Sequence, residues 1–175
     1  MRRIAIACLF VAVHGCGPDF NIRKDPDLER ISPKELARLK HVRVDPNFQP
    51  SVSAKSDWQI HTLLANRVAL ADGDMTTVAA SSREHRKGDW ILIDLGCLCL
   101  FQSVRQHHGD AEPPPTYRVD TAGEEGFPFT LEFVGPGEHG ESVATFPRPV
   151  HARFIRITVL EDSPQPWRVA ELDID

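Results

Sequence analysis

GDWILIDLG, residues 88–96, is the stretch that decides the fold, together with its later counterpart ARFIRITVL, residues 152–160. In the second stretch apolar Ile155 and Ile157 flank polar Arg156. Apolar side chains at every second position are typical of a strand with one buried face. Both stretches therefore predict strands, and they set the pattern to look for in the rest of the chain.

The rest of the chain from residue 51 onward repeats this pattern of short strands separated by turns. Clusters such as GDAEPPP, AGEEGFP and GPGEHGE separate the apolar runs. Strands are expected near residues 51–55, 90–95, 100–107, 116–121, 129–134, 142–146, 152–160 and 167–174. Eight short strands with regular turn signals favour an all-β sandwich. Residues 56–89 show little periodicity and read as long loops.

The composition places the protein in the ordinary globular class. The chain has 175 residues, of which 41% are hydrophobic and 26% charged, and its formal net charge is −5. This length suits one domain with a sizeable core. The negative charge and the absence of a Lys/Arg run argue against nucleic acid as a partner.

The N-terminus reads as a targeting segment, residues 1–15. A basic start, MRR, precedes the apolar run IAIACLFVAV, which is too short to span a bilayer. The sequence VHGC that follows resembles the lipobox of bacterial lipoproteins and would make Cys16 the lipidated first residue of the mature chain. The resemblance implies a lipid-anchored protein of the bacterial cell envelope, with the outer membrane favoured over the inner. An ordinary cleaved signal peptide, with Cys16 incidental, is the alternative.

Residues 16–50 read as a tether that contains one short helix. Ser32 is a good N-cap, Pro33 suits the first helical position, and Glu35 completes a capping box. A helix is therefore expected over residues 33–40.

Two cysteines, Cys97 and Cys99, remain after the leader and Cys16 are set aside. On a flat strand, residues two apart point to the same face, in a poor geometry for a bond to each other. Small apolar residues packed in a core are the expected role, and a two-thiol metal or redox site is the alternative.

Four motifs in order resemble the discoidin, or factor V/VIII C-type, domain, which includes the family 32 carbohydrate-binding modules. They are ANRVALADGDMTT, GDWILIDLG, ARFIRITVL and WRVAELDID, and they fall within residues 51–175. No single motif is specific, but their order over this span is. The resemblance implies an eight-stranded jelly-roll sandwich of the galactose-binding-domain-like type.

The same resemblance implies a structural calcium ion that ties the loop ADGDMTT to the last strand. Carboxylate, hydroxyl and carbonyl oxygens suit this hard cation. The ligands it implies are Ala69, Asp72, Asp74, Thr77, Ala170 and Glu171. The tryptophan that usually follows the threonine is Ala79 here, and an Asx-type turn is the plain alternative.

A glycan is the ligand that the resemblance favours, bound by loops at one end of the sandwich. Sugars need an apolar ring to stack on and charged groups to pair with their hydroxyls. The candidates are Trp58, Glu84, His85, Arg86, Arg105, His107, His108 and Trp167. Each also has a plain reading as a core, edge or solvated residue.

Catalysis is not expected, because no nucleophile, metalloprotease or phosphate-loop signature occurs. His107, His108 and Asp110 could serve as metal ligands, and Glu124–Glu125 could serve as a carboxylate pair, but neither set has a supporting partner in the sequence. The predicted function is non-catalytic binding of a glycan. The alternatives are a scaffold that contacts an envelope protein and, less favoured at this net charge, a phospholipid-binding domain.

Overall fold

The computed structural model describes residues 49–125 and 128–175, and within them the protein is built from eight strands and two short 3-10 turns. The strands are β1 Gln59–Thr62, β2 Ala79–Glu84, β3 Trp90–His107, β4 Thr116–Ala122, β5 Thr130–Pro136, β6 Glu141–Val159, β7 Pro166–Val169 and β8 Glu171–Ile174. The turns are η2 Lys55–Asp57 and η3 Arg67–Leu70.

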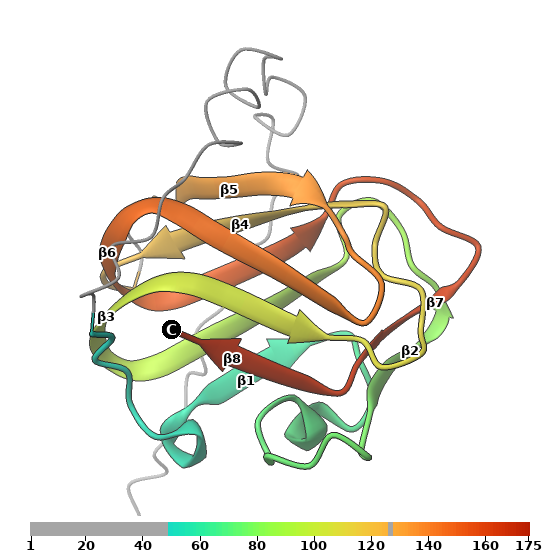
Figure 1. Cartoon of the computed structure of the whole chain (residues 1–175), viewed down its shortest axis with the longest axis horizontal. Helices are drawn as coiled ribbons and strands as arrows, with labels where there is room; N and C mark the ends of the chain where they lie inside the picture. The colour runs from blue at the N-terminus through green and yellow to red at the C-terminus, as the bar shows by residue number, and fades with distance from the viewer. Residues whose placement is uncertain (1–48, 126–127) are drawn as a thin grey trace, which may run out of the picture. The chain divides into compact units, whose positions relative to one another are not determined.

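The fold is a β-sandwich whose two long strands, β3 and β6, contribute to both layers (Figure 1). The first part of β3 and the last part of β6 pair with each other and with β1 and β4, and β5 adds beyond β4. The other parts of β3 and β6 pair with each other, and β8 adds to β3. A separate two-stranded sheet joins β2 to β7.

The bends in the two long strands follow from glycine and proline. Gly96 has φ +76°, a left-handed conformation that suits glycine, and the β3–β6 register shifts between Asp94 and Cys99. Pro147 and Pro149 lie between Thr145 and Val150, in the part of β6 that is not paired with β3. Their missing N–H groups therefore cost no strand pairing.

The core lies between the layers, and it uses the alternation seen in the sequence. Ile91 pairs with Ile157 and Ile93 with Ile155, and all four are fully buried. The largest fully buried side chains are Trp167, Tyr117, Phe101, Phe146, Leu70, Ile91, Ile93, Leu95, Ile155, Ile157, Leu172 and His85.

The all-β sandwich is confirmed, but several predicted strand boundaries were wrong. The strand expected at 51–55 is absent: Ser51 makes one bridge to Leu100, and the chain then turns into η2. The segment 56–89, expected to be loops, contains β1 and β2. The strands predicted at 90–95 and 100–107 are one strand, β3, and those at 142–146 and 152–160 are one strand, β6, because the bulges bend each strand without ending its pairing. The strand predicted at 167–174 is two strands, β7 and β8.

The predicted leader, lipidation site Cys16 and tether helix lie outside the described residues. Within the described part, no helix has the length and hydrophobicity that a membrane span requires.

Candidate functional site

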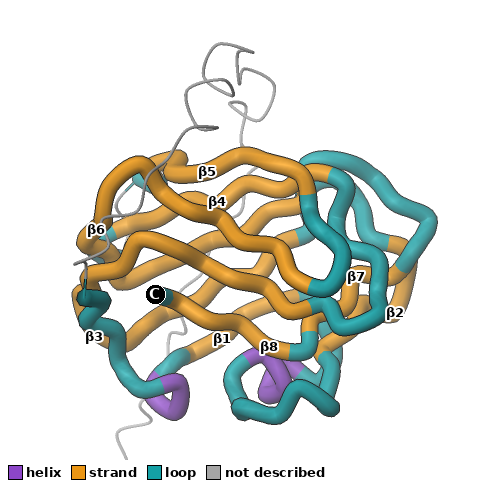
Figure 2. Tube along the Cα trace, in the orientation of Figure 1, coloured by secondary structure: helices purple, strands orange, loops and turns teal. Residues whose placement is uncertain are grey.

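A hollow of about 290 Å³ lies between the β2–β3 loop and the β6–β7 loop. Figure 2 shows both loops at the end of the molecule where β2 and β7 lie. The hollow is lined by Glu84, His85, Arg86, Asp162, Ser163 and Pro164. The structure therefore brings together three residues predicted from the sequence and three from a segment 78 positions further along the chain.

Main-chain hydrogen bonds hold the two loops against each other. The His85 N–H donates to the Gln165 carbonyl at 3.0 Å, and the Ser163 N–H donates to the His85 carbonyl at 3.1 Å. The Lys87 N–H donates to Asp162 Oδ1 at 2.7 Å. The walls of the hollow are thus preformed, which reduces the ordering that a ligand would have to impose.

The carboxylate of Asp89 holds the β2–β3 loop in place. Its buried carboxylate accepts two hydrogen bonds from Arg83, at 2.7 and 3.1 Å, and one from the Arg86 N–H at 2.9 Å. This forked pair fixes the backbone of Arg86 and leaves its side chain exposed.

His85 is the unusual residue of the hollow. Its side chain is fully buried, and among the described residues neither ring nitrogen has a hydrogen-bond partner. Burial lowers the pKa of His85 and outweighs the opposing effect of Asp89 and Asp162, so the ring is neutral at neutral pH. A neutral imidazole offers one donor and one acceptor, and leaving both unmade costs free energy. A ligand hydroxyl, which both donates and accepts, could satisfy such a ring after a small side-chain movement, because none of the His85 side chain is exposed.

The exposed groups around His85 complement it. Glu84 and Asp162 present carboxylates, Arg86 presents a guanidinium, and Pro164 presents an apolar ring. Carboxylates accept from hydroxyl groups and guanidinium donates to them, so the set suits a small polyhydroxylated ligand.

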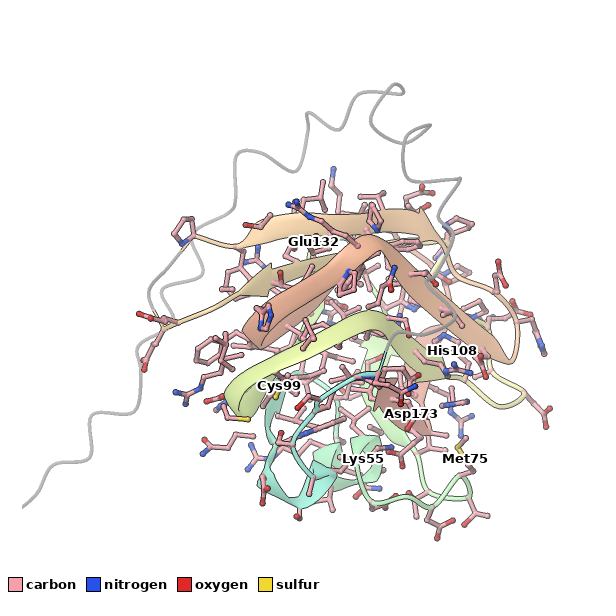
Figure 3. All side chains as sticks on the ribbon, turned by 60° about the vertical axis from the view of Figure 1, so that its left-hand side comes forward. Lys55, Met75, Cys99, His108, Glu132 and Asp173 are labelled. Carbon is pink, nitrogen blue, oxygen red and sulfur yellow. The ribbon has the colours of Figure 1, made fainter. Side chains whose placement is uncertain are left out.

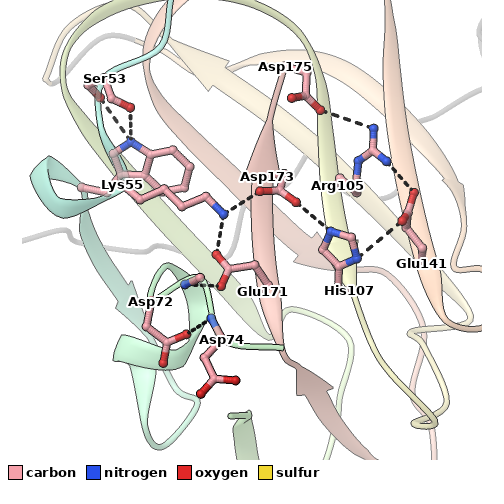
Figure 4. Close-up of polar contacts among 12 residues, drawn as sticks. Ser53, Lys55, Asp72, Asp74, Arg105, His107, Glu141, Glu171, Asp173 and Asp175 are labelled. Atoms are coloured by element: carbon pink, nitrogen blue, oxygen red, sulfur yellow. Dashed lines mark hydrogen bonds and ion pairs between the residues drawn. The ribbon is translucent and has the colours of Figure 1, made fainter. Parts of the chain in front are cut away.

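The other predicted ligand residues do not line this hollow. Figure 4 shows Arg105 and His107 in a chain of polar contacts across β3, β6 and β8. His107 Nε2 lies 2.7 Å from Asp173, and Arg105 lies 2.9 Å from Glu141. These side chains bridge strands.

His108 is buried and serves the fold (Figure 3). Its Nδ1 lies 3.0 Å from the Arg168 carbonyl and its Nε2 lies 2.9 Å from Ser142 Oγ. A carbonyl only accepts, so Nδ1 carries the proton and the Ser142 hydroxyl donates to Nε2. Burial lowers the pKa of His108, which keeps this arrangement neutral.

The two candidate tryptophans do not form an exposed platform. Trp58 is half-buried against the core, and its indole N–H lies 3.2 Å from the Ser53 carbonyl. Trp167 is 1% exposed. Trp167 therefore has no exposed face for a sugar to stack on, and Trp58 lies outside the hollow.

The loop between η3 and β2 lies against the last strand, β8. The Gly73 N–H donates to Glu171 Oε2 at 2.8 Å, although the two residues are 98 positions apart. Within the loop, Thr77 Oγ1 lies 2.8 Å from Asp72 Oδ2 and 3.0 Å from the Asp74 carbonyl. These hydrogen bonds, with that from the Asp74 N–H to Asp72 Oδ1 at 2.9 Å, form the Asx-type turn that was the alternative, and they bring three oxygen atoms of the expected ligand set close together.

The strand half of the expected calcium site fits less well. Glu171 is 3% exposed, and its second oxygen, Oε1, accepts from the Lys55 ammonium at 2.6 Å (Figure 4). Lys55 also contacts Asp173 at 2.5 Å. Burial lowers the pKa of Lys55, but the hydrogen bonds to these carboxylates outweigh it and the pKa is raised. Among the described residues, no group of three or more His, Cys, Asp or Glu side chains could hold a metal. The positive charge beside Glu171 is that of Lys55. The other two expected ligands, Ala69 and Ala170, are buried. Ala69 lies in η3, and Ala170 lies between β7 and β8.

Sequence reasoning missed Lys55 and the β6–β7 loop. Lys55 had no signal, because its partners lie 116 and 118 positions away. The loop SPQP after Asp162 reads as an ordinary turn, and its place beside His85 depends on the pairing of β2 with β7.

Comparison with solved structures identifies the class of fold. The family 32 module of NanJ from Clostridium perfringens, in complex with galactose, matches with a TM-score of 0.60 at 19% identity, over 72% of this chain and 98% of that one. Chitosan-binding module 1 from a Paenibacillus sp. IK-5 chitosanase/glucanase matches with a TM-score of 0.56 at 21% identity, over 67% and 92%. A further Clostridium perfringens family 32 module, CpGH89CBM32-5, in complex with GalNAc-β-1,3-galactose, gives 0.57 at 17% identity, over 71% and 99%.

The chain therefore has the fold of the family 32 carbohydrate-binding modules, a galactose-binding-like β-sandwich, as the sequence motifs predicted. Each of these modules is covered over nearly its whole length, whereas a Ruminococcus gnavus fucosidase is covered over only 24%. No protein-family model matches the sequence, and no curated protein does.

Proposed function

We propose that this domain binds glycans, without catalysis, in the hollow between the β2–β3 and β6–β7 loops. The observation that carries the proposal is His85, buried in the wall of the hollow with both ring nitrogens unpartnered among the described residues. Glu84, Arg86 and Asp162 surround it with groups that pair with sugar hydroxyls. Two solved modules of the same fold carry galactose or a galactose-containing disaccharide, which supports a first test with such sugars.

A glycan array with the purified protein tests this, followed by calorimetry on each sugar that binds. The variants Arg86→Ala and Glu84→Ala remove one charged group each from the rim. Each should weaken binding at least about tenfold, because a charged hydrogen bond contributes roughly 1.5–3 kcal/mol. Arg67→Ala is the matched control: this arginine is exposed on η3, outside the hollow.

Equal affinity of wild type, Arg86→Ala and Glu84→Ala for the bound sugar would place the site elsewhere. No binding across a broad array by a folded sample would refute the glycan proposal. In that case a contact with another protein becomes the better account.

A protein partner is the second candidate, and one observation favours it. Three large apolar side chains are exposed within thirteen residues: Leu63 at 58%, Val68 at 71% and Met75 at 53%. All three lie on the stretch of chain around η3, and a contiguous patch of exposed apolar groups marks an interaction surface. Loss of a co-purifying partner in a Leu63→Ser, Val68→Ser double variant, with glycan binding unaffected, would establish this surface as separate from the hollow.

We also propose that a calcium ion can bind at the loop of Asp72, Asp74 and Thr77. The convergence of their oxygens supports this, whereas the Lys55 ammonium on Glu171 opposes it. The two cations would compete for one carboxylate.

The envelope location is a further part of the proposal and rests on the sequence VHGC. Acylation of Cys16 would hold the sandwich at the bacterial membrane, with the outer membrane as the favoured site. Acyl chains anchor a protein through about 0.8 kcal/mol per buried CH₂.

A further inference from the structure

Cys97 and Cys99 lie closer together than a flat strand permits. Their sulfur atoms are 3.2 Å apart, which corrects the expectation of a poor geometry. Residues i and i+2 of a flat strand are separated by about 6.6 Å, too far for their Cβ atoms to approach bonding distance. The bend in β3 brings the two thiols together.

The bend is fixed by contacts that do not involve the thiols. The Gly96 N–H donates to Asp94 Oδ1 at 2.8 Å, and Arg153 holds both oxygens of Asp94 at 2.7 and 2.8 Å. Gly96 takes the left-handed conformation, φ +76°. The thiols are thus held in place by the neighbouring turn.

The two sulfurs differ in their access to solvent. Cys97 is exposed, whereas Cys99 is 2% exposed and lies at the turn of β3 (Figure 3). Cys99 Sγ also lies 3.4 Å from the Cys97 carbonyl and 3.9 Å from Ser53 Oγ. An exposed sulfur can meet a soluble oxidant, and a buried sulfur beside it can complete the reaction.

We propose that Cys97 and Cys99 are a redox modification site that forms a reversible intramolecular disulfide with a small or protein disulfide as oxidant. The Cys97 thiolate attacks one sulfur of the oxidant, so that a mixed disulfide forms and one thiolate leaves. Cys99 then loses its proton and attacks the Cys97 sulfur, which releases the second thiolate. Two protein thiols are oxidised, and the oxidant disulfide is reduced to two thiols.

The surroundings of Cys97 set the pace of the first step. The hydrogen bond with Cys99 raises the pKa of the exposed Cys97 thiol, and the charge of Asp57 adds to this effect. The thiolate is the attacking species, so the reaction should accelerate as pH rises toward and above the ordinary thiol range.

Peptide mass analysis of the full-length protein, oxidised with glutathione disulfide, tests the proposal. Cleavage after Lys87 and Arg105 gives one peptide, 88–105, that contains both thiols and no other cysteine. We expect this peptide to lose the mass of two hydrogens and to resist alkylation. In Cys99→Ser, Cys97 should instead carry glutathione, and in Cys97→Ser the buried Cys99 should stay unmodified.

The effect of the fold on disulfide formation is measured by comparing the thiol–disulfide equilibrium with glutathione in buffer and in concentrated urea. The native chain should form the disulfide with an equilibrium constant about tenfold or more above the unfolded chain, which corresponds to about 30 mV. Glutathione adducts on the wild-type peptide, or equal equilibrium constants in the native and unfolded chains, would overturn the proposal.

Discussion

His85 concentrates the functional argument in one residue. A buried imidazole with no described partner costs stability, and under the proposed function a bound ligand would offset that cost. Replacement by phenylalanine keeps an aromatic ring but removes both nitrogens.

We therefore expect His85→Phe to abolish sugar binding while leaving the free energy of unfolding unchanged or higher by about 1 kcal/mol. Calorimetry measures the first effect and denaturant unfolding measures the second. A variant that loses about 2 kcal/mol or more of stability and still binds sugar would show that His85 is only a packing residue.

The buried His108 predicts that the stability of the fold depends on pH. Its folded pKa is lowered by burial, with a smaller effect from the neighbouring His107 and His139, while an unfolded histidine titrates near pH 6.5. Below that value the unfolded chain binds more protons than the folded chain. The stability contributed by neutral His108 is therefore complete above about pH 7.5 and falls as the pH drops, by at most about 1.4 kcal/mol per pH unit.

Urea unfolding between pH 7.5 and 5 should show a shallower loss of stability in His108→Gln than in wild type. Some loss will remain in the variant, because the pKa of His85 is also lowered. Identical slopes for the two proteins would contradict the assigned role of His108.

At the scale of elements, one lysine joins the first described turn to the last strand. Lys55 on η2 contacts Glu171 and Asp173 on β8, and Glu171 is buried. Removal of the ammonium would leave a buried carboxylate with one fewer partner, at a cost of about 1–3 kcal/mol.

We expect Lys55→Met to lower the melting temperature and to make it calcium-sensitive. Calcium should raise the melting temperature of this variant more than that of wild type, because the ion no longer competes with an ammonium. Lys87→Met, an exposed substitution outside this network, is the control. An equal calcium effect in wild type and Lys55→Met would rule out competition for Glu171.

The elements that could be predicted from the sequence are those with a buried face. The alternation around Ile155 and Ile157 gave the last part of β6 correctly, because inward and outward positions differ in polarity. Strand β2, AASSRE, was missed because its small and charged residues carry no such contrast. The continuity of β3 through Gly96 was also missed, because a bulge and a turn share the same residue preferences.

At the scale of the whole molecule, the candidate site could be predicted only in part. Glu84, His85 and Arg86 were predicted because the family resemblance points to the loop before GDWILIDLG, and adjacent residues in one loop lie together. Asp162 joins them only through the pairing of β2 with β7, a contact that local sequence does not encode. Arg105 and His107 were chosen for their chemistry, and their partners, Glu141 and Asp173, come from two other strands.

The lipid anchor predicts a behaviour of the whole chain. If Cys16 is acylated, the protein made in a bacterial host should incorporate labelled fatty acid and sediment with membranes. Cys16→Ser should do neither, whereas Cys97→Ser should do both. Labelled fatty acid retained by Cys16→Ser would contradict the lipoprotein assignment.

The most direct test of the central claim is an NMR titration of the ¹⁵N-labelled protein with galactose and with GalNAc-β-1,3-galactose. We predict that the amide signals of residues 84–87 and of Asp162, Ser163 and Gln165 shift first and saturate together. Shifts confined to another surface, or no shifts with any glycan that the array retains, would contradict the assignment of the hollow as a sugar-binding site.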